Sequence, residues 1–204
     1  MRKRGKMISL LQGLIKEIGP HYTVLNVNGI GFYVSVADEH AFVVEQKCEL
    51  HIYFHWNTEA GPQLFGFTSK LAKTVFSLII SCPGIGPKIG LAALAQLSPE
   101  AFLQAILLND IKALSSLHGI GTKKAEALVL CLKNKITKLD IGAHTGAEVG
   151  ALKQFKQVSD ALSSLNYSRT EISGALEFVK NNSTDATKFD EMLRKALSYL
   201  AKKA

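Results

Sequence analysis

The hydrophobic pattern of the first third of the chain is that of β-strands. Short runs of branched and aliphatic residues are separated by polar or glycine-containing turns, and Asn28-Gly29 is the pair that two-residue hairpins favour. We predict five strands, over residues 8–18, 22–27, 32–36, 49–56 and 63–67. Five short strands in about sixty residues predict a small closed barrel, for which the OB-fold is the commonest candidate. Sequence order alone does not distinguish this barrel from an SH3-like one.

From residue 68 onward the apolar positions recur at helical spacing. A first helix is predicted over 69–80. Ser98 followed by Pro99 marks the start of another helix, because serine caps helix N-termini and proline suits the first turn. Farther along, five apolar residues share one helix face: Ala125, Leu128, Val129, Leu132 and Ile136.

A stretch of small and polar residues then separates this helical region from the last third of the chain. Three glycines are spaced through residues 139–151, which predicts a flexible linker. Beyond it, amphipathic helices are predicted over 152–165, 169–180 and 188–203. Ser168 with Glu171 has the spacing of a capping box, and Thr187 with Asp190 has a closely related one. Three such helices predict a small bundle that is tethered to the rest.

Together these patterns predict an α+β protein of several domains. The predicted parts are a basic tail (1–6), an OB-fold barrel (7–67), a helical domain (68–138), the linker (139–151) and a three-helix bundle (152–204). The tail, Arg2-Lys3-Arg4-Gly5-Lys6, is interpreted as an extension that precedes a natural start at Met7.

The helical domain contains an internal repeat. A Gly-Ile-Gly tripeptide at 84–86 returns 35 residues later at 119–121, and each copy has a lysine two positions after its second glycine. Glycines allow a tight turn whose main chain is bare, and a helix that begins there points unpaired N–H groups and its positive dipole end at an anion. Two ordinary turns between helices are the alternative. The repeat predicts phosphate binding by these residues: Gly84, Ile85, Gly86, Lys88, Gly119, Ile120, Gly121, Lys123 and Lys124.

Charge follows the same division of the chain. The net charge is +7, and residues 68–138 carry nine basic and three acidic side chains, whereas residues 7–67 carry two basic and six acidic ones. Positive charge therefore accompanies the repeated turns, as a protein that binds a polyanion requires.

Other chemistry is sparse in the sequence. The three cysteines are far apart and form no Cys-x-x-Cys pair, which favours a reduced, cytoplasmic protein with buried thiols. No apolar run approaches the roughly 20 residues that cross a bilayer. His51 and His55 have no further ligand nearby in the sequence that would support a zinc site. We therefore predict no metal, no cofactor and no catalytic residue. The sequence also lacks Gly-x-x-x-x-Gly-Lys-[Ser/Thr], so any ATP-driven work would belong to a partner.

The succession of barrel, doubled hairpin, linker and bundle resembles the RuvA family, the Holliday-junction-binding subunits of the bacterial branch migration complex. The resemblance covers essentially everything after Met7. It rests on four short motifs: Gly29-Ile30-Gly31-Phe32, Leu64-Phe65-Gly66-Phe67, Gly84-Ile85-Gly86-Pro87-Lys88 and Gly119-Ile120-Gly121-Thr122-Lys123-Lys124-Ala125.

The resemblance implies a function and a set of partners. It implies that residues 68–138 form a tandem helix-hairpin-helix domain, which grips DNA backbones without reading bases, and that the last domain is a UBA-like bundle. It further implies a homotetramer that holds a four-way junction open while the RuvB ATPase drives branch migration, with RuvC resolving the junction afterwards.

Two further surfaces are implied in the same way. In the family the turn between the last two strands carries two adjacent acids, an acidic pin that repels phosphates at the crossover; here Glu59 matches the first acid and Ala60 stands at the second position. A solvated turn residue is the alternative for Glu59. RuvB is expected to dock on Leu165, Tyr167, Leu193, Leu197 and Leu200, although the bundle's own core needs most of these side chains. Trp56, beside the turn, is expected to pack on the barrel rather than to stack on a base.

Two other functions stay open at this point. Lys123 and Asp140 have the spacing of the catalytic lysine and aspartate of some helix-hairpin-helix DNA glycosylases, although Asp140 opens the predicted linker instead of lining a pocket. A generic DNA-binding adaptor is the other alternative, and it would bind a junction no better than a duplex.

Overall fold

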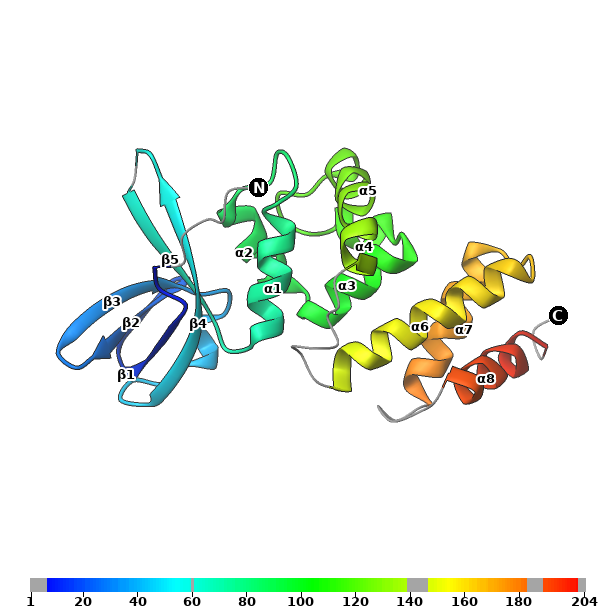
Figure 1. The fold of residues 1–204 in the computed structure, drawn as a ribbon, viewed down its shortest axis with the longest axis horizontal. Helices are drawn as coiled ribbons and strands as arrows, with labels where there is room; N and C mark the ends of the chain where they lie inside the picture. The colour runs from blue at the N-terminus through cyan, green and yellow to red at the C-terminus, as the bar shows by residue number, and fades with distance from the viewer. Residues whose placement is uncertain (1–6, 60, 139–146, 183–188, 202–204) are drawn as a thin grey trace.

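The computed structural model describes residues 7–59, 61–138, 147–182 and 189–201, and its first part is a five-stranded barrel (Figure 1). The predicted strands are all present, with boundaries that differ by a few residues. They are β1 (Leu10–Gly19), β2 (Tyr22–Val27), β3 (Ile30–Ser35), β4 (Lys47–Asn57) and β5 (Gly61–Phe67).

The barrel closes in the order β1-β2-β3-β5-β4. β1 pairs antiparallel with both β2 and β4, and β3 meets β5 in parallel at Ser35 and Phe65. A five-stranded barrel with these crossed connections is the Greek-key arrangement of the OB-fold, which confirms that prediction over the SH3-like alternative. Its interior is filled by alternate residues of the strands, including Ile15, Leu25 and Leu50, all fully buried.

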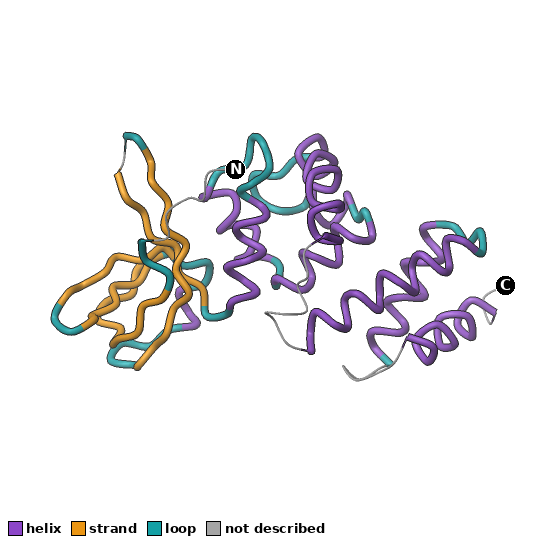
Figure 2. Tube along the Cα trace, in the orientation of Figure 1, coloured by secondary structure: helices purple, strands orange, loops and turns teal. Residues whose placement is uncertain are grey.

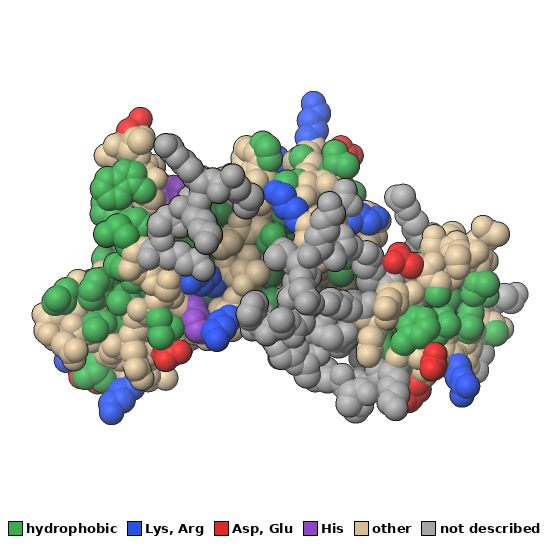
Figure 3. Space-filling view, viewed as in Figure 1, with side chains coloured by type: hydrophobic (Ala, Val, Ile, Leu, Met, Phe, Trp, Pro, Cys, Tyr) green, Lys and Arg blue, Asp and Glu red, His purple; other side chains and the backbone are tan. Residues whose placement is uncertain are grey.

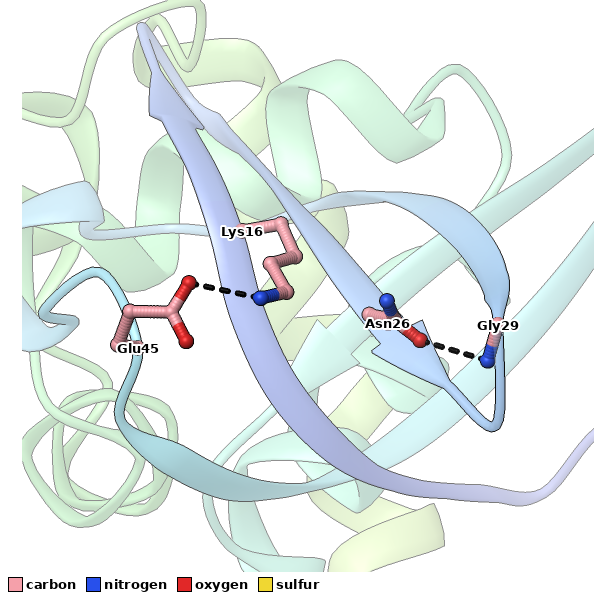
Figure 4. Close-up of polar contacts among 4 residues, drawn as sticks. All are labelled: Lys16, Asn26, Gly29 and Glu45. Carbon is pink, nitrogen blue, oxygen red and sulfur yellow. Dashed lines mark hydrogen bonds and ion pairs between the residues drawn. The ribbon is translucent and has the colours of Figure 1, made fainter.

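Local polar contacts hold the barrel's turns in place (Figure 4). Asn28 and Gly29 both have positive φ, 51° and 90°, as a two-residue hairpin between twisted strands requires. The side-chain oxygen of Asn26 accepts the Gly29 N–H at 2.8 Å. Lys16 on β1 forms a 2.8 Å ion pair with Glu45, in the loop that follows the short 3-10 helix η1 (Glu39–Ala41).

Helices follow the barrel directly (Figure 2). Ser69 caps the first one by accepting the Ala72 N–H at 3.0 Å, and Ser98 caps the third in the same way, as its position before Pro99 predicts. The helices enclose one apolar core that includes Phe102, Leu114 and Leu128. They are α1 (Lys70–Ile79), α2 (Pro87–Gln96), α3 (Pro99–Leu108), α4 (Ile111–Ser115) and α5 (Thr122–Lys138).

The barrel and the helical domain share a cluster of aromatic side chains. Phe76 of α1 is fully buried, with ring centroids 5.2 Å from Phe65 and 4.9 Å from Phe67 on β5, and 5.3 Å from Tyr53 on β4. Leu91 of α2 belongs to the same cluster. Because one buried ring contacts two strands and its own helix is part of the helical core, the two domains are packed against each other rather than merely connected.

The last three helices form a bundle with its own core. They are α6 (Ala147–Ser164), α7 (Arg169–Asn181) and α8 (Phe189–Ala201). The capping box of Ser168 and Glu171 is confirmed, whereas Thr187 lies outside the described residues. The predicted linker was too long at its end, because residues 147–151, Gly150 among them, are the first of α6; a helix with a packed face outweighs the low helix propensity of a single glycine. Leu108 at the end of α3 packs against the bundle's core.

No single helix within the described ranges is long and apolar enough to cross a membrane, although α2 and α3, bent by 98°, pass the same test of length and composition as a pair.

Candidate nucleic-acid interface

The two Gly-Ile-Gly segments form the same turn, residue for residue. In the first, the Ile85 N–H donates to the Cys82 carbonyl at 3.3 Å; in the second, the Ile120 N–H donates to the Leu117 carbonyl at 3.0 Å. In the helices that follow, Gly90 donates to Gly86 at 3.0 Å and Ala125 donates to Gly121 at 3.0 Å. These residues keep the 35-residue spacing of the sequence repeat, so the repeat corresponds to one turn built twice.

The first glycine of each turn is required by the backbone. Gly84 has φ 78° and Gly119 has φ 81°, in the left-handed region that side chains with a Cβ rarely adopt. Between the glycines, Ile85 and Ile120 are 6% and 2% exposed. The isoleucine side chains therefore anchor the turn in the core, and only their main chain is left to face a ligand.

The second glycine is different, because the fold does not require it. Gly86 has an ordinary extended backbone, φ −92° and ψ 173°, and Gly121 is not among the residues with positive φ. A Cβ added at either position would meet nothing within 4 Å. Each of these glycines precedes a helix, α2 or α5, so the missing side chain leaves the first N–H groups of that helix uncovered. This is the arrangement that lets a phosphate approach a helix N-terminus.

The second turn is held against the helix that follows the first one. The His118 N–H donates to the side-chain oxygen of Gln96, near the end of α2, at 3.3 Å. A Cβ on Gly119 would lie 3.4 Å from the side chain of Ile89, also on α2. Neither Gln96 nor Ile89 carries a sequence signal for this role, because the contact depends on how the helices pack.

The three predicted lysines are arranged differently from one another. Lys88 and Lys123 are both exposed, in the first turns of α2 and α5. Lys88 also lies at an apolar groove of about 800 Å³ between the barrel and α2, lined by Phe54, Leu64 and Leu91 among others. Lys124 instead turns back and donates from Nζ to the Gly119 carbonyl at 3.0 Å. Its ammonium group thus braces the second turn in addition to adding charge there.

The hairpin between β4 and β5 protrudes from the barrel. In Figure 1 it rises on the same side of the molecule as the loop between α1 and α2, which contains the first Gly-Ile-Gly turn. Glu59 is exposed in its turn, where its N–H donates to the Asn57 side chain at 2.8 Å. Ala60 lies outside the described residues. Figure 3 shows acidic atoms at the end of this hairpin and hydrophobic side chains below them.

The expectation that Trp56 packs on the barrel is wrong. Its side chain is 63% exposed, although its neighbour on the same strand face, Phe54, has its ring centroid 6.4 Å away. Trp56 pairs with Pro62 across the hairpin, beyond the part of β4 that is wrapped into the barrel core. The strand is longer than the barrel needs, so its end leaves the indole in solvent.

The residues expected to bind a partner in the last domain mostly serve the bundle. Leu200 is 5% exposed and belongs to its core, so this residue does not offer a docking surface. Tyr167, Leu193 and Leu197 are partly buried against the same core. Leu165 is 55% exposed. Phe178, 37% exposed and stacked on Tyr199 at 5.0 Å, is another exposed aromatic side chain of the bundle.

Groups suited to other chemistry are few. Within the described ranges no three histidine, cysteine or acidic side chains gather into a possible metal site. Burial raises the pKa of the Cys82 thiol to about 12, and its hydrogen bond with Cys131 acts in the same direction, so Cys82 is an unreactive core thiol. Asp140, the second residue of the glycosylase alternative, lies outside the described residues.

The fold and its doubled turn define a class: a tandem helix-hairpin-helix protein with an OB-type barrel before the helices. Comparison with known families agrees. Residues 7–66 match the model of the RuvA N-terminal domain, and residues 76–134 match that of the SAM-like helix-hairpin-helix tandem.

Full-length relatives are also similar. The chain is 35% identical over 197 residues to the Holliday junction branch migration complex subunit RuvA of Tropheryma whipplei, covering 96% of this chain and 99% of the relative. It is 33% identical over 205 residues to the protein of that name from Latilactobacillus sakei, covering 97% and 100%. It is 32% identical to the one from Natranaerobius thermophilus. The chain belongs to the RuvA family.

Proposed function

We propose that this chain binds four-way DNA junctions through their phosphates, without regard to sequence, and holds them for branch migration. The observation that carries the proposal is the bare second glycine of each hairpin, Gly86 and Gly121. Neither backbone conformation nor packing demands glycine there, so the open space is best explained by a ligand that approaches the main chain. The relatives' name, subunit of a Holliday junction branch migration complex, supports the junction as that ligand.

Each hairpin would contribute one phosphate contact. In it, N–H groups at the helix start and the exposed Lys88 or Lys123 face one phosphate, while Ile85 or Ile120 keeps the turn anchored from below. Such contacts carry no base information, so preference for a junction has to come from the placement of several hairpins at once. A homotetramer, which we propose from the family, would set four pairs of hairpins around one centre, and the apolar groove between barrel and α2 is a surface that such an assembly can cover.

Glu59 would act near that centre as the acidic pin. It is exposed at the end of the protruding hairpin, where a carboxylate repels phosphates and so favours separated strands. The chain contributes no ATPase motif of its own, so it is a non-catalytic subunit and movement of the junction is the work of RuvB. We propose that the last bundle binds RuvB through a surface that includes Leu165, and that RuvC acts on the junction in the same complex.

A gel shift with a synthetic four-way junction and a linear duplex of the same arm sequence tests the proposal. With excess competitor duplex, the junction is expected to survive as discrete bands. Gly86→Ala and Gly121→Ala should each weaken junction binding about tenfold, the equivalent of one charge-assisted hydrogen bond of about 1.5 kcal/mol.

Stability separates this effect from unfolding. Gly86→Ala and Gly121→Ala are expected to melt close to the wild-type temperature, because alanine fits their space and only the modest preference of helix N-caps for glycine over alanine is lost. Gly84→Ala is the contrasting variant, and its φ of 78° predicts a loss of about 1–2 kcal/mol. Equal binding to junction and duplex would favour the generic adaptor. Release of a damaged base that Lys123→Ala abolishes would revive the glycosylase alternative.

A further inference from the structure

Trp56 is a large aromatic side chain that the barrel does not use. It lies next to the end of β4, three residues before Glu59, and is 63% exposed. Strand pairing continues on both sides of it, with Trp56 opposite Pro62 and Asn57 opposite Gly61, and the Glu59 N–H donates to the Asn57 side chain. An indole held on an ordered strand costs less conformational entropy to bind than one on a loose loop.

The surroundings of Trp56 suit an aromatic ligand. Phe54 supports it from the same strand face, 6.4 Å away, and Pro62 and Leu64 follow on the facing strand. The acid at the hairpin's turn disfavours the approach of phosphates, while uncharged bases are not repelled. The two side chains therefore act on different parts of a nucleotide. The exposed ring can stack on the base, and the carboxylate repels the phosphate.

We propose that Trp56 is a base-stacking site that takes an unpaired nucleobase at the centre of the junction. This proposal rests on the proposed function, because only a junction brings unpaired bases to the protruding hairpin. Base pairs at a migrating crossover are continually broken and formed, so bases lose their stacking partners there. Stacking on an aromatic ring is tolerant of sequence, since every base has a π-face, and it therefore suits a protein that works on any sequence. It also gives the hairpin a second way to favour separated strands.

The sequence provides a direct probe, because Trp56 is its one tryptophan. The emission of the intact protein is followed while a four-way junction carrying a dye on one arm end is added, and dye anisotropy reports binding in the same samples. Stacking predicts quenching of Trp56 emission that saturates with junction binding, and little quenching by the duplex of matching arm sequence. An unchanged emission while anisotropy reports junction binding would overturn the stacking site and leave the proposed function standing. Equal anisotropy curves for junction and duplex would instead overturn the function.

Variants give a second readout. Trp56→Ala is expected to weaken junction binding about tenfold and to leave duplex binding unchanged, whereas Trp56→Phe retains most of the affinity because it keeps a stacking ring. Phe178→Ala, which removes an exposed aromatic from the bundle, is the matched control and should bind the junction like wild type. Circular dichroism melts of each variant identify any loss of folding, and the quenching of Trp56 emission in the intact protein carries the test if the alanine variant does not fold.

A competing explanation is that a second copy of the chain covers Trp56. In that case the emission maximum of the protein alone shifts to shorter wavelength as its concentration rises, and added junction causes no further change. That result would overturn the base-stacking site. A maximum that stays at the wavelength of exposed indole until junction is added supports it.

Discussion

At the scale of single residues, the three lysines near the hairpins differ in what else they contact. Lys88 and Lys123 are exposed in the first turns of their helices, whereas the Lys124 ammonium donates to the Gly119 carbonyl. A lysine whose charge neutralises a phosphate releases counterions when DNA binds, so its removal changes the salt dependence of binding. A lysine that braces a turn affects stability as well.

This difference predicts distinct effects for three substitutions. Lys88→Ala and Lys123→Ala should each weaken binding to junction and duplex alike, and each should flatten the slope of log affinity against log salt by about one unit. Lys124→Ala should change the slope less and lower the melting temperature more. Anisotropy titrations across a series of salt concentrations measure the slopes. If Lys124→Ala flattens the slope as much as Lys88→Ala, its hydrogen bond to Gly119 does not hold it away from DNA.

Residue roles were predictable from sequence where local backbone chemistry determines them. The two Gly-Ile-Gly turns, the Asn28-Gly29 hairpin and the Ser168 cap depend on a few neighbouring residues, and the structure has all of them. The direction of Lys124, the exposure of Trp56 and the burial of Leu200 depend on tertiary packing. Periodicity places Leu200 on an apolar face, but it does not say that two other helices cover that face.

At the scale of elements, α7 begins with a charged cap. The Glu171 carboxylate accepts hydrogen bonds from the Ser168 hydroxyl at 2.6 Å and the Ser168 N–H at 2.8 Å. These bonds, the side-chain one first, lower the pKa of Glu171 below its usual 4.5. Because the pKa is lower in the folded chain, the stabilisation is fully present at neutral pH and is lost as the pH falls through the folded value.

We therefore expect the Glu171 carboxylate to raise the bundle's melting temperature at neutral pH, and to lose this effect once the pH is low enough to protonate it in the folded chain. Glu171→Gln should lower it at pH 7, and the difference from wild type should shrink as the pH falls below 4.5. Thermal melts followed by circular dichroism across pH 3 to 7 check this. Glu177→Gln, an exposed glutamate on the same helix, is the control. A difference that stays constant with pH would mean that the charge of Glu171 is not what stabilises the cap.

Element boundaries were predictable where a cap or turn marks them, as at Ser69, Ser98 and Ser168. The start of α6 has no such marker. The glycines of the predicted linker favour a loop locally, so the sequence did not predict a helix that begins at Ala147.

At the scale of the whole molecule, the arrangement of barrel and hairpins depends on Phe76. Its ring is fully buried against Tyr53, Phe65 and Phe67 of the barrel. No sequence pattern predicts this contact, because an apolar residue on an amphipathic helix has the same signal whether it faces its own domain or another.

Phe76→Ala should lower the free energy of unfolding by about 3–5 kcal/mol, the usual loss for a fully buried phenylalanine. Hydrogen exchange should speed up on both sides of the contact, in β5 and in α1. Phe102→Ala is the matched control, since Phe102 is equally buried but lies within the helical core. It should speed exchange in the helices more than in β5. The same exchange pattern for both variants would mean that Phe76 does not join the domains.

The packing of Phe76 also links the position of the protruding hairpin to that of the first Gly-Ile-Gly turn. β5 starts at the protruding hairpin and presents Phe65 and Phe67 to Phe76, and the helix that carries Phe76 ends just before the first Gly-Ile-Gly turn. The distance from the hairpin to that turn therefore depends on the packing of this aromatic core. For the proposed junction binding, this distance predicts that extra unpaired nucleotides between the crossover and an arm displace the phosphates of that arm from the hairpins, so affinity should fall with each nucleotide added.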